Sequence, residues 1–434
     1  MEQLKLNQNG EKLFEEITSN EQLIRAFKAV KANHGAPGID RQTVEEFEAN
    51  LQEEVSKLSQ EVRAWRYEVR PVRRVRIPKP NGGERLLGIP CIRDRVLQYS
   101  IKMSIEPLFD WEFSESSFGF RPGRSQRQAI EQAKELVTSG KRWIVDIDLE
   151  QFFDLMNHDR IIYRAGLKVE DKRVLNLIGL TLRSGILENG ELEPSQEGAP
   201  QGSPLSPLLS NIILDELDKE LEDRKLQFCR YADDCNIFVG SLKAGERVRK
   251  SITKFIEKRL KLKVNEAKSK VVPAREMKFL GFTILRGFIA ISRKTVKRTM
   301  ETIKALTPPR THVPLEVQVQ RINRWYVGWV GYYGMTELPS QLQAIEAHIR
   351  RRLRAQFVRN QKRKRHLRTK LISRGVAPKT AGSIYAPRKR WWLSASRAAH
   401  LAWPNAWFKR LGLVTVSAQL RPHWQPLDVW IKFA

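Results

Sequence analysis

The segment FCRYADDCNIFV, residues 228–239, decides how this chain is interpreted. Two apolar runs rich in β-forming residues enclose Ala232, Asp233 and Asp234, so the pattern predicts a β-hairpin with two adjacent carboxylates at its turn. Aspartate is common in turns because its side chain bonds to the nearby backbone. The pair alone therefore leaves a purely structural role open.

A second acidic segment, WIVDIDL at residues 143–149, is predicted to form another strand. Asp146 and Asp148 are two positions apart, so both side chains point to one face of that strand. A carboxylate on an otherwise apolar strand is costly to bury unless it is paired or binds a cation. If this strand and the hairpin are neighbours in one sheet, three carboxylates converge. Oxygen ligands of this kind suit Mg²⁺, and a pair of such ions serves in-line phosphoryl transfer.

The surrounding sequence predicts a mixed α+β fold. Residues 70–90 alternate arginines with Val72, Val75 and Ile77 around an Asn-Gly-Gly turn, which indicates a basic β-hairpin. Apolar periodicity predicts helices over 11–60, 92–108, 125–138, 205–221 and 246–260. The proline-rich loop before the helix at 205 carries Gln201, whose amide could bond a base edge or a sugar. The same loop is also explained as an ordinary helix entry.

Positive charge is concentrated in the last third of the chain. The whole sequence of 434 residues has a formal net charge of +28, and residues 286–434, with 30 basic and 5 acidic side chains, carry +25 of it. Eight of the eleven tryptophans lie in the same region. The stretch 349–370 holds eleven Lys or Arg and no acid, and its apolar spacing predicts one helix with a buried stripe. This composition favours a nucleic-acid partner, with a membrane surface or an acidic protein as the alternative.

Several classes of protein are excluded by composition. No apolar run approaches the roughly 18 residues of a membrane span, and the polar N-terminus predicts no secretory signal. The three cysteines, Cys91, Cys229 and Cys235, are too few for a disulfide framework or an all-cysteine zinc module. We therefore expect a protein of the reducing cytosol.

Taken together, the motifs resemble those of a bacterial group II intron-encoded reverse transcriptase. Seven segments match the successive blocks of that family in order: RIPKPNGGERLLGIP (76–90), SSFGFRPGRS (116–125), DIDLEQFFDLMNHD (146–159), PQGSPLSPLLSNI (200–212), RYADDCNIFV (230–239), LKLKVNEAKSK (260–270) and KFLGF (278–282). IRRRLR (349–354), WWLSASRAAH (391–400) and WFKRLGLV (407–414) are similar to its thumb, or maturase, region. The nearest subgroup is group IIC, which has no endonuclease domain, and we expect none here.

The resemblance implies a right-hand polymerase, with fingers and palm built from an antiparallel sheet and helices, followed by an all-helical basic thumb. The expected domains are an N-terminal extension with fingers at 1–90, fingers and palm at 91–285, a thumb or maturase domain at 286–380, and a basic, tryptophan-rich segment at 381–434.

The resemblance also implies a set of site residues. Asp148, Asp233 and Asp234 would be catalytic and would hold two Mg²⁺ ions, with Mn²⁺ as a possible substitute. Asp148 is preferred over Asp146 because Phe153, which matches the steric gate against ribonucleotides, follows five positions later. The remaining expected nucleotide-binding residues are Lys79, Arg85, Gln201 and Lys268, and the expected primer grip is Phe279, Leu280 and Gly281. The expected nucleic-acid contacts of the thumb are Arg350, Arg351, Arg352, Arg354, Lys362, Arg363, Lys364 and Arg365.

The implied function is RNA-directed DNA polymerisation by two-metal phosphoryl transfer, with a maturase role in splicing and retrohoming. The implied partners are an RNA template, a DNA primer and dNTPs, together with a cognate intron RNA and target DNA, in the bacterial cytosol or nucleoid and without a membrane. Two alternatives stay open: a domesticated relative acting in DNA repair or phage defence, and a non-catalytic splicing factor on a polymerase scaffold. The sequence leaves the oligomeric state open.

Overall fold

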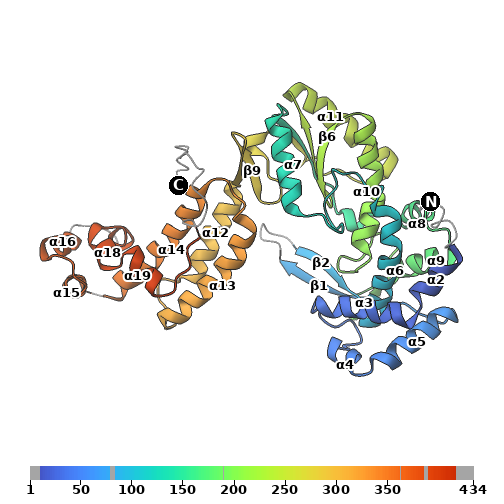
Figure 1. The fold of residues 1–434 in the computed structure, drawn as a ribbon, viewed down its shortest axis with the longest axis horizontal. Helices are drawn as coiled ribbons and strands as arrows, with labels where there is room; N and C mark the ends of the chain where they lie inside the picture. The colour runs from blue at the N-terminus through green and yellow to red at the C-terminus, as the bar shows by residue number, and fades with distance from the viewer. Residues whose placement is uncertain (1–9, 79–83, 189, 362, 386–389, 417–434) are drawn as a thin grey trace. The chain divides into compact units, whose positions relative to one another are not determined.

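The computed structural model describes residues 10–78, 84–188, 190–361, 363–385 and 390–416. Lys79 and Lys362, expected to contact nucleotide and nucleic acid, lie outside the described residues. The chain divides into two compact units, Met1–Ala274 and Arg275–Ala434, which are described separately (Figure 1).

The first unit begins with a group of helices. They are α2 (Gly10–Ile17), α3 (Asn20–Ala32), α4 (Val44–Ala49), α5 (Leu51–Arg63) and the longer α6 (Ile92–Asp110). Local signals set their starts: Ser19 caps α3, and Thr43 with Glu46 forms a capping box at α4. The helices predicted over residues 11–60 and 92–108 are thus present.

A four-stranded sheet has the strand order β2-β1-β4-β5, and its first two strands lie between α5 and α6 in the chain. The predicted basic hairpin is formed by β1 (Val72–Pro78) and β2 (Glu84–Ile89), which pair antiparallel. The strands β4 (Ile186–Glu188) and β5 (Glu191–Glu193) extend the sheet. These two were not predicted, because each has three residues and no clear apolar alternation.

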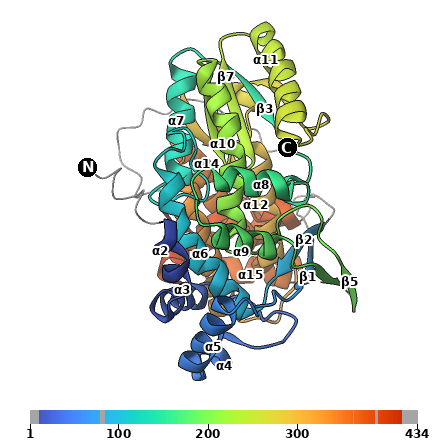
Figure 2. The ribbon, with the colours of Figure 1, turned by 90° about the vertical axis from the view of Figure 1, so that its right-hand side faces the viewer.

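A second four-stranded sheet carries the acidic segments, with strand order β6-β7-β3-β8. Its strands are β3 (Trp143–Ile147), β6 (Gln227–Tyr231), β7 (Asp234–Val239) and β8 (Lys270–Pro273), and all neighbouring pairs are antiparallel. Figures 1 and 2 show the helices α7 (Gln126–Thr138), α10 (Ser206–Asp223) and α11 (Leu242–Phe255) beside this sheet, and each contacts its strands. Two further helices complete the unit, α8 (His158–Gly166) and α9 (Lys172–Leu182).

The second unit is mostly helical, as expected. A hairpin of β9 (Phe282–Leu285) and β10 (Phe288–Ile291) precedes α12 (Arg293–Leu306), α13 (Leu315–Tyr333), α14 (Pro339–Asn360), α15 (Lys364–Ile372), α16 (Pro378–Gly382), α17 (Arg390–Leu393), α18 (Arg397–Ala402) and α19 (Asn405–Arg410). We expected the division near residue 285. The hairpin belongs to the helical unit instead, because the backbone of Ile291 bonds twice with the side chain of Gln341. Among the described residues, no helix is long and apolar enough to cross a bilayer.

The basic stretch at 349–370 is not the single helix that its spacing predicted. α14 ends at Asn360 and α15 begins at Lys364, with extended backbone at Gln361 between them. The predicted apolar stripe is buried along α14 through Leu353 to Val358, with Phe357 partly buried beside it. Leu367 and Leu371 then join the same core from α15, so the chain turns to bury both apolar groups.

Candidate active site

The Asp233–Asp234 pair lies at a tight turn between β6 and β7, as predicted. Tyr231 pairs with Asp234, and Ala232 and Asp233 form the turn. Ala232 adopts a φ of 57°, in the left-handed region that a residue with a side chain enters at some cost. The turn therefore needs support from its surroundings, and Asp233 and Asp234 are held half-buried.

β3 lies directly beside β7, which confirms the expected neighbourhood of the two acidic segments. Ile147 is opposite Cys235, and Asp146 is opposite Asn236. Asp148 follows the end of β3 and is fixed by its backbone: its N–H donates to the hydroxyl of Ser269 over 3.0 Å, and its carbonyl accepts from the N–H of Asn265 over 2.8 Å. The lone acid and the pair thus approach each other from adjacent strands.

The carboxylates influence one another electrostatically. Burial and the neighbouring charges of Asp146 and Asp233 raise the pKa of Asp234 to about 8. Burial also raises the pKa of Asp233, with a further contribution from the charge of Asp148. Crowded carboxylates of this kind are stabilised in the ionised form when a cation lies among them.

The residues fit a divalent cation by their chemistry, since the donors are carboxylate oxygens. Within the described ranges, however, no three His, Cys, Asp or Glu side chains lie close enough together to coordinate one metal ion. Binding an ion would have to draw Asp148, Asp233 and Asp234 closer.

Two predicted basic residues lie near these acids. The ammonium of Lys268 is 3.3 Å from a carboxylate oxygen of Asp148, and both side chains are partly exposed. Arg85, on β2, is exposed, and its charge opposes the rise in the pKa of Asp233. The structure therefore brings together residues from the basic hairpin, the acidic turn and the loop before β8.

Phe153 and Gln201 lie on two segments that are held to neighbouring segments by backbone hydrogen bonds. The carbonyl of Phe153 accepts a hydrogen bond from Ala199 over 2.7 Å, and the carbonyl of Gln201 accepts one from Gly88 on β2 over 2.9 Å. Gly202, with a φ of 129°, lies so close to the Gly88 carbonyl that a Cβ would clash. A cavity of about 120 Å³ is lined by both residues and by Arg74, Leu87 and Pro200.

The predicted primer grip belongs to the second unit. Phe279 is fully buried, and Leu280 and Gly281 form a turn with φ values of 52° and 83°. The hydroxyl of Tyr332 donates to the carbonyl of Leu280 over 2.7 Å, which fixes the turn to α13. Its contact with a primer stays a prediction.

The basic residues of α14 do not all face solvent, contrary to expectation. Arg354 is only 2% exposed, and its guanidinium donates to the carbonyl of Trp403 over 2.8 Å, so it is a core residue. Arg350 and Arg352 are half-buried, and Arg352 bonds the carbonyl and hydroxyl of Thr307. Arg351 lies over the rings of Trp391 and Trp392. The reason is that one face of this helix packs on the tryptophan-rich segment.

The charges of α15 and the turn before it do face solvent. Arg363, Lys364 and Arg365 are exposed. Among the expected contacts of the thumb, these three have the clearest access to a phosphate backbone.

One feature next to the acidic turn was not predicted. Arg230 is fully buried in an ion pair with Asp218 of α10. The sequence does show that Arg230 is a charged residue in an otherwise apolar run, which indicates a buried partner. The spacing does not identify Asp218 as that partner.

Comparison with known families and proteins agrees with this architecture. Residues 77–284 match the family model described as reverse transcriptase (RNA-dependent DNA polymerase), and residues 296–374 match the group II intron, maturase-specific domain. The two matches fall almost entirely in the first and second unit, respectively.

Two curated proteins are similar to this chain over about two thirds of its length. Protein YkfC of Escherichia coli (strain K12) is 33% identical over 336 residues, which cover 68% of this chain and 88% of YkfC. The group II intron-encoded protein LtrA of Lactococcus lactis subsp. cremoris is 30% identical over 355 residues, with 65% of this chain and 59% of LtrA covered. A solved structure titled "Partial Cas6-RT-Cas1--Cas2 complex" is 25% identical with a TM-score of 0.36, covering 57% of this chain and 42% of that one. The chain belongs to the family of group II intron-type reverse transcriptases and maturases.

Proposed function

We propose that this protein is an RNA-directed DNA polymerase whose reaction centre is formed by Asp148, Asp233 and Asp234. The observation that carries the proposal is the placement of these carboxylates at the ends of the adjacent strands β3 and β7, where the charges of Asp148 and Asp233 both contribute to the raised pKa of Asp234. Attack of a primer 3′-OH on the α-phosphate of a dNTP forms the new phosphodiester bond and releases pyrophosphate. Most of the catalysis would come from positioning and from stabilisation of the developing charge.

In this proposal the three acids hold two Mg²⁺ ions, with Mn²⁺ able to replace them. The ions would supply charge neutralisation at the reacting phosphate. The chain's own residues supply the rest. Arg85 would bind the triphosphate through its planar fork, together with Lys79. Phe153 would exclude a ribose 2′-OH, and Gln201 would contact the nucleotide or template. Lys268 would protonate the leaving pyrophosphate.

The polymerase proposal is tested by primer extension on an RNA template with Mg²⁺. The wild-type chain is compared with the Asp233→Ala/Asp234→Ala variant, and circular dichroism verifies that both are folded. We expect incorporation by the wild type and none by the variant. A folded wild-type chain that extends no primer would support the non-catalytic alternative.

We further propose that the helical unit acts as a maturase by binding a cognate intron RNA, and that the complete particle uses a target DNA in retrohoming. The match of residues 296–374 to the maturase-specific domain and the exposed charges around Arg363 support this role. The role is binding, because the RNA would supply the splicing chemistry. The expected place of action is the bacterial cytosol or nucleoid.

The maturase role is tested by first sequencing the DNA around the reading frame for group II intron RNA domains and then using the RNA that they encode. Splicing of that RNA at low Mg²⁺ is measured with and without the protein. The Asp233→Ala/Asp234→Ala variant is the control, because it should lose polymerisation and keep splicing. Equal splicing with and without protein would contradict the maturase proposal.

A further inference from the structure

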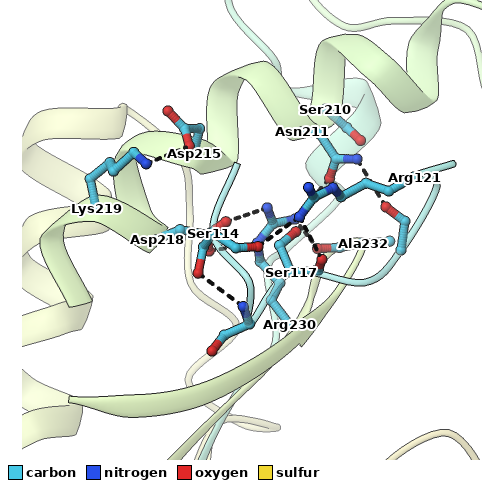
Figure 3. Close-up of polar contacts among 12 residues, drawn as sticks. Ser114, Ser117, Arg121, Ser210, Asn211, Asp215, Asp218, Lys219, Arg230 and Ala232 are labelled. Atoms are coloured by element: carbon cyan, nitrogen blue, oxygen red, sulfur yellow. Dashed lines mark hydrogen bonds and ion pairs between the residues drawn. The ribbon is translucent and has the colours of Figure 1, made fainter. Parts of the chain in front are cut away.

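The turn that carries Asp233 rests on a buried polar network, shown in Figure 3. At its centre, the guanidinium of Arg230 donates from Nε to one carboxylate oxygen of Asp218 over 2.7 Å and from Nη2 to the other over 2.5 Å. Both side chains are fully buried. This is the bidentate geometry in which an arginine fixes direction as well as charge.

The remaining donor of Arg230 reaches the acidic turn itself. Nη1 donates to the carbonyl of Ala232 over 2.9 Å and to the side-chain oxygen of Asn211 over 3.0 Å. Ala232 is the residue with the unfavourable positive φ, and it directly precedes Asp233. The Arg230 guanidinium therefore determines where the Ala232 carbonyl points, and with it the orientation of the next peptide.

The network also holds the turn from its other side. The amide of Asn211 donates to the carbonyl of Gly119 over 2.9 Å, and the backbone of Arg230 pairs with Ser116 and Phe118. A Cβ on Gly119 would lie only 2.2 Å from the nitrogen of Ala232, so this glycine packs directly against the turn. Ala232 is thus enclosed between the 116–119 loop and the Arg230 side chain.

We propose that Arg230, held by Asp218 and Asn211 of α10, is a positioning residue that fixes Asp233 and Asp234 in the orientation required for binding a divalent cation. The inference rests on the proposed function, in which these acids are the ligands. A stability role alone explains the pair poorly, because a buried ion pair is often no better for stability than well-packed apolar residues of the same volume. What apolar residues cannot supply is the donor to the Ala232 carbonyl.

Two variants separate positioning from stability. Arg230→Lys keeps the buried charge beside Asp218, but one ammonium cannot reproduce the planar fork that reaches Asp218, Asn211 and Ala232 at once. Arg230→Met/Asp218→Leu removes both charges and leaves no unpaired ion in the core. Arg354→Met is the matched control, since Arg354 is likewise buried and bonds a backbone carbonyl, but in the second unit.

The measurement is direct binding of Mn²⁺ to the 434-residue chain. The EPR signal of the free ion reports the binding, and circular dichroism is the folding check. The wild type should bind above the baseline set by Asp233→Ala/Asp234→Ala. We expect both Arg230 variants to bind Mn²⁺ at least about tenfold more weakly, the size typical of losing a group that orients metal ligands. Arg354→Met should bind as the wild type does.

Each outcome decides a separate question. A wild type that does not exceed the baseline would remove the proposed metal site itself. A wild type that binds, with folded Arg230 variants that bind equally well, would overturn only the positioning role. Loss of the folded state in both Arg230 variants would also overturn it, since the pair would then be needed for stability.

Discussion

The ammonium nitrogen of Lys268 lies 3.3 Å from a carboxylate oxygen of Asp148, and the loop that carries Lys268 also fixes the Asp148 backbone. Asn265 and Ser269, at the two ends of this loop, bond the carbonyl and the N–H of Asp148. Lys268 is therefore held beside the proposed reaction centre from the side opposite to the acidic turn of β6 and β7. This position suits a group that donates a proton to a leaving phosphate.

Replacing Lys268 by alanine should lower the rate of single-nucleotide incorporation by about 100-fold, which is typical of losing a general acid. Binding of the primer–template should be unchanged, because the substitution alters none of the residues proposed to contact it. Pre-steady-state extension with a saturating primer–template measures the rate. Lys263→Ala is a close control, since Lys263 forms an ion pair with Glu150 at 3.0 Å and is 65% exposed, as Lys268 is. Equal losses in the two variants would contradict a specific role for Lys268.

The raised pKa of Asp234, about 8, predicts how stability depends on pH. In the folded, metal-free chain the Asp234 carboxyl binds a proton more tightly than in the unfolded chain. Its contribution to the free energy of unfolding is therefore fully present below the pKa of the unfolded chain, and it is lost as the pH rises toward 8. The free energy of unfolding should fall by up to about 1.4 kcal/mol per pH unit from this group. Asp234→Asn should remove that part of the slope, which chemical denaturation between pH 5 and pH 9 in the presence of EDTA measures. Identical slopes for both chains would contradict the prediction.

The stabilisation of the folded chain by a divalent cation should increase with pH, whereas the stabilisation by protonation of Asp234 decreases with pH. Since a divalent cation binds the ionised carboxylates, the stabilisation by Mg²⁺ should be larger at pH 8.5 than at pH 6.5. Thermal unfolding with and without Mg²⁺ at the two pH values measures the difference. The Asp233→Ala/Asp234→Ala variant is the control and should show no Mg²⁺ dependence of this kind at either pH.

The strands themselves were predictable, because β3, β6 and β7 are short apolar runs with acids at spacings that suit strands. The spacing left the meeting of β3 with β7 conditional, and the expectation that Asp148 meets Asp233 and Asp234 came from the family resemblance. The buried ion pair between Arg230 and Asp218, which contacts the acidic turn, was not predictable. Asp218 and Arg230 are twelve positions apart, on a helix and a strand, and no periodicity relates such a pair.

The basic helix shows a second limit of sequence reasoning. Charge density alone did not distinguish Arg354, which is buried against Trp403, from Arg363, which is exposed. The long aliphatic stem of arginine packs well against indole rings, so a helix rich in arginine can turn a charged face toward a tryptophan-rich core. Which arginines do so depends on tertiary packing, and the sequence shows only the periodicity of the apolar residues.

Phe153 should control the choice between deoxyribonucleotides and ribonucleotides. Phe153→Ala should raise the relative incorporation of ribonucleotides by about 10- to 100-fold, the range expected when a pocket loses a steric contact. The ratio of kcat/KM for dNTP and rNTP measures it. Phe152 provides the control, because its ring contacts that of Phe153 edge-on but is only 3% exposed. Phe152→Leu should lower stability and leave the ratio unchanged, and an equal change of ratio in both variants would contradict a specific gate.

The exposed cations at the start of α15 should bind RNA through phosphates. Replacing Arg363, Lys364 and Arg365 by alanine should weaken binding and reduce the slope of log K against log salt by about 0.7 per lost contact to single-stranded RNA. Filter binding between 50 and 300 mM KCl measures the slope, since each phosphate contact releases a counterion. Removing three exposed cations of α11, Lys243, Arg247 and Lys250, lowers the net charge equally and should leave the slope as it is. If both triple variants change the slope to the same extent, the binding reflects total charge and α15 is not a specific contact.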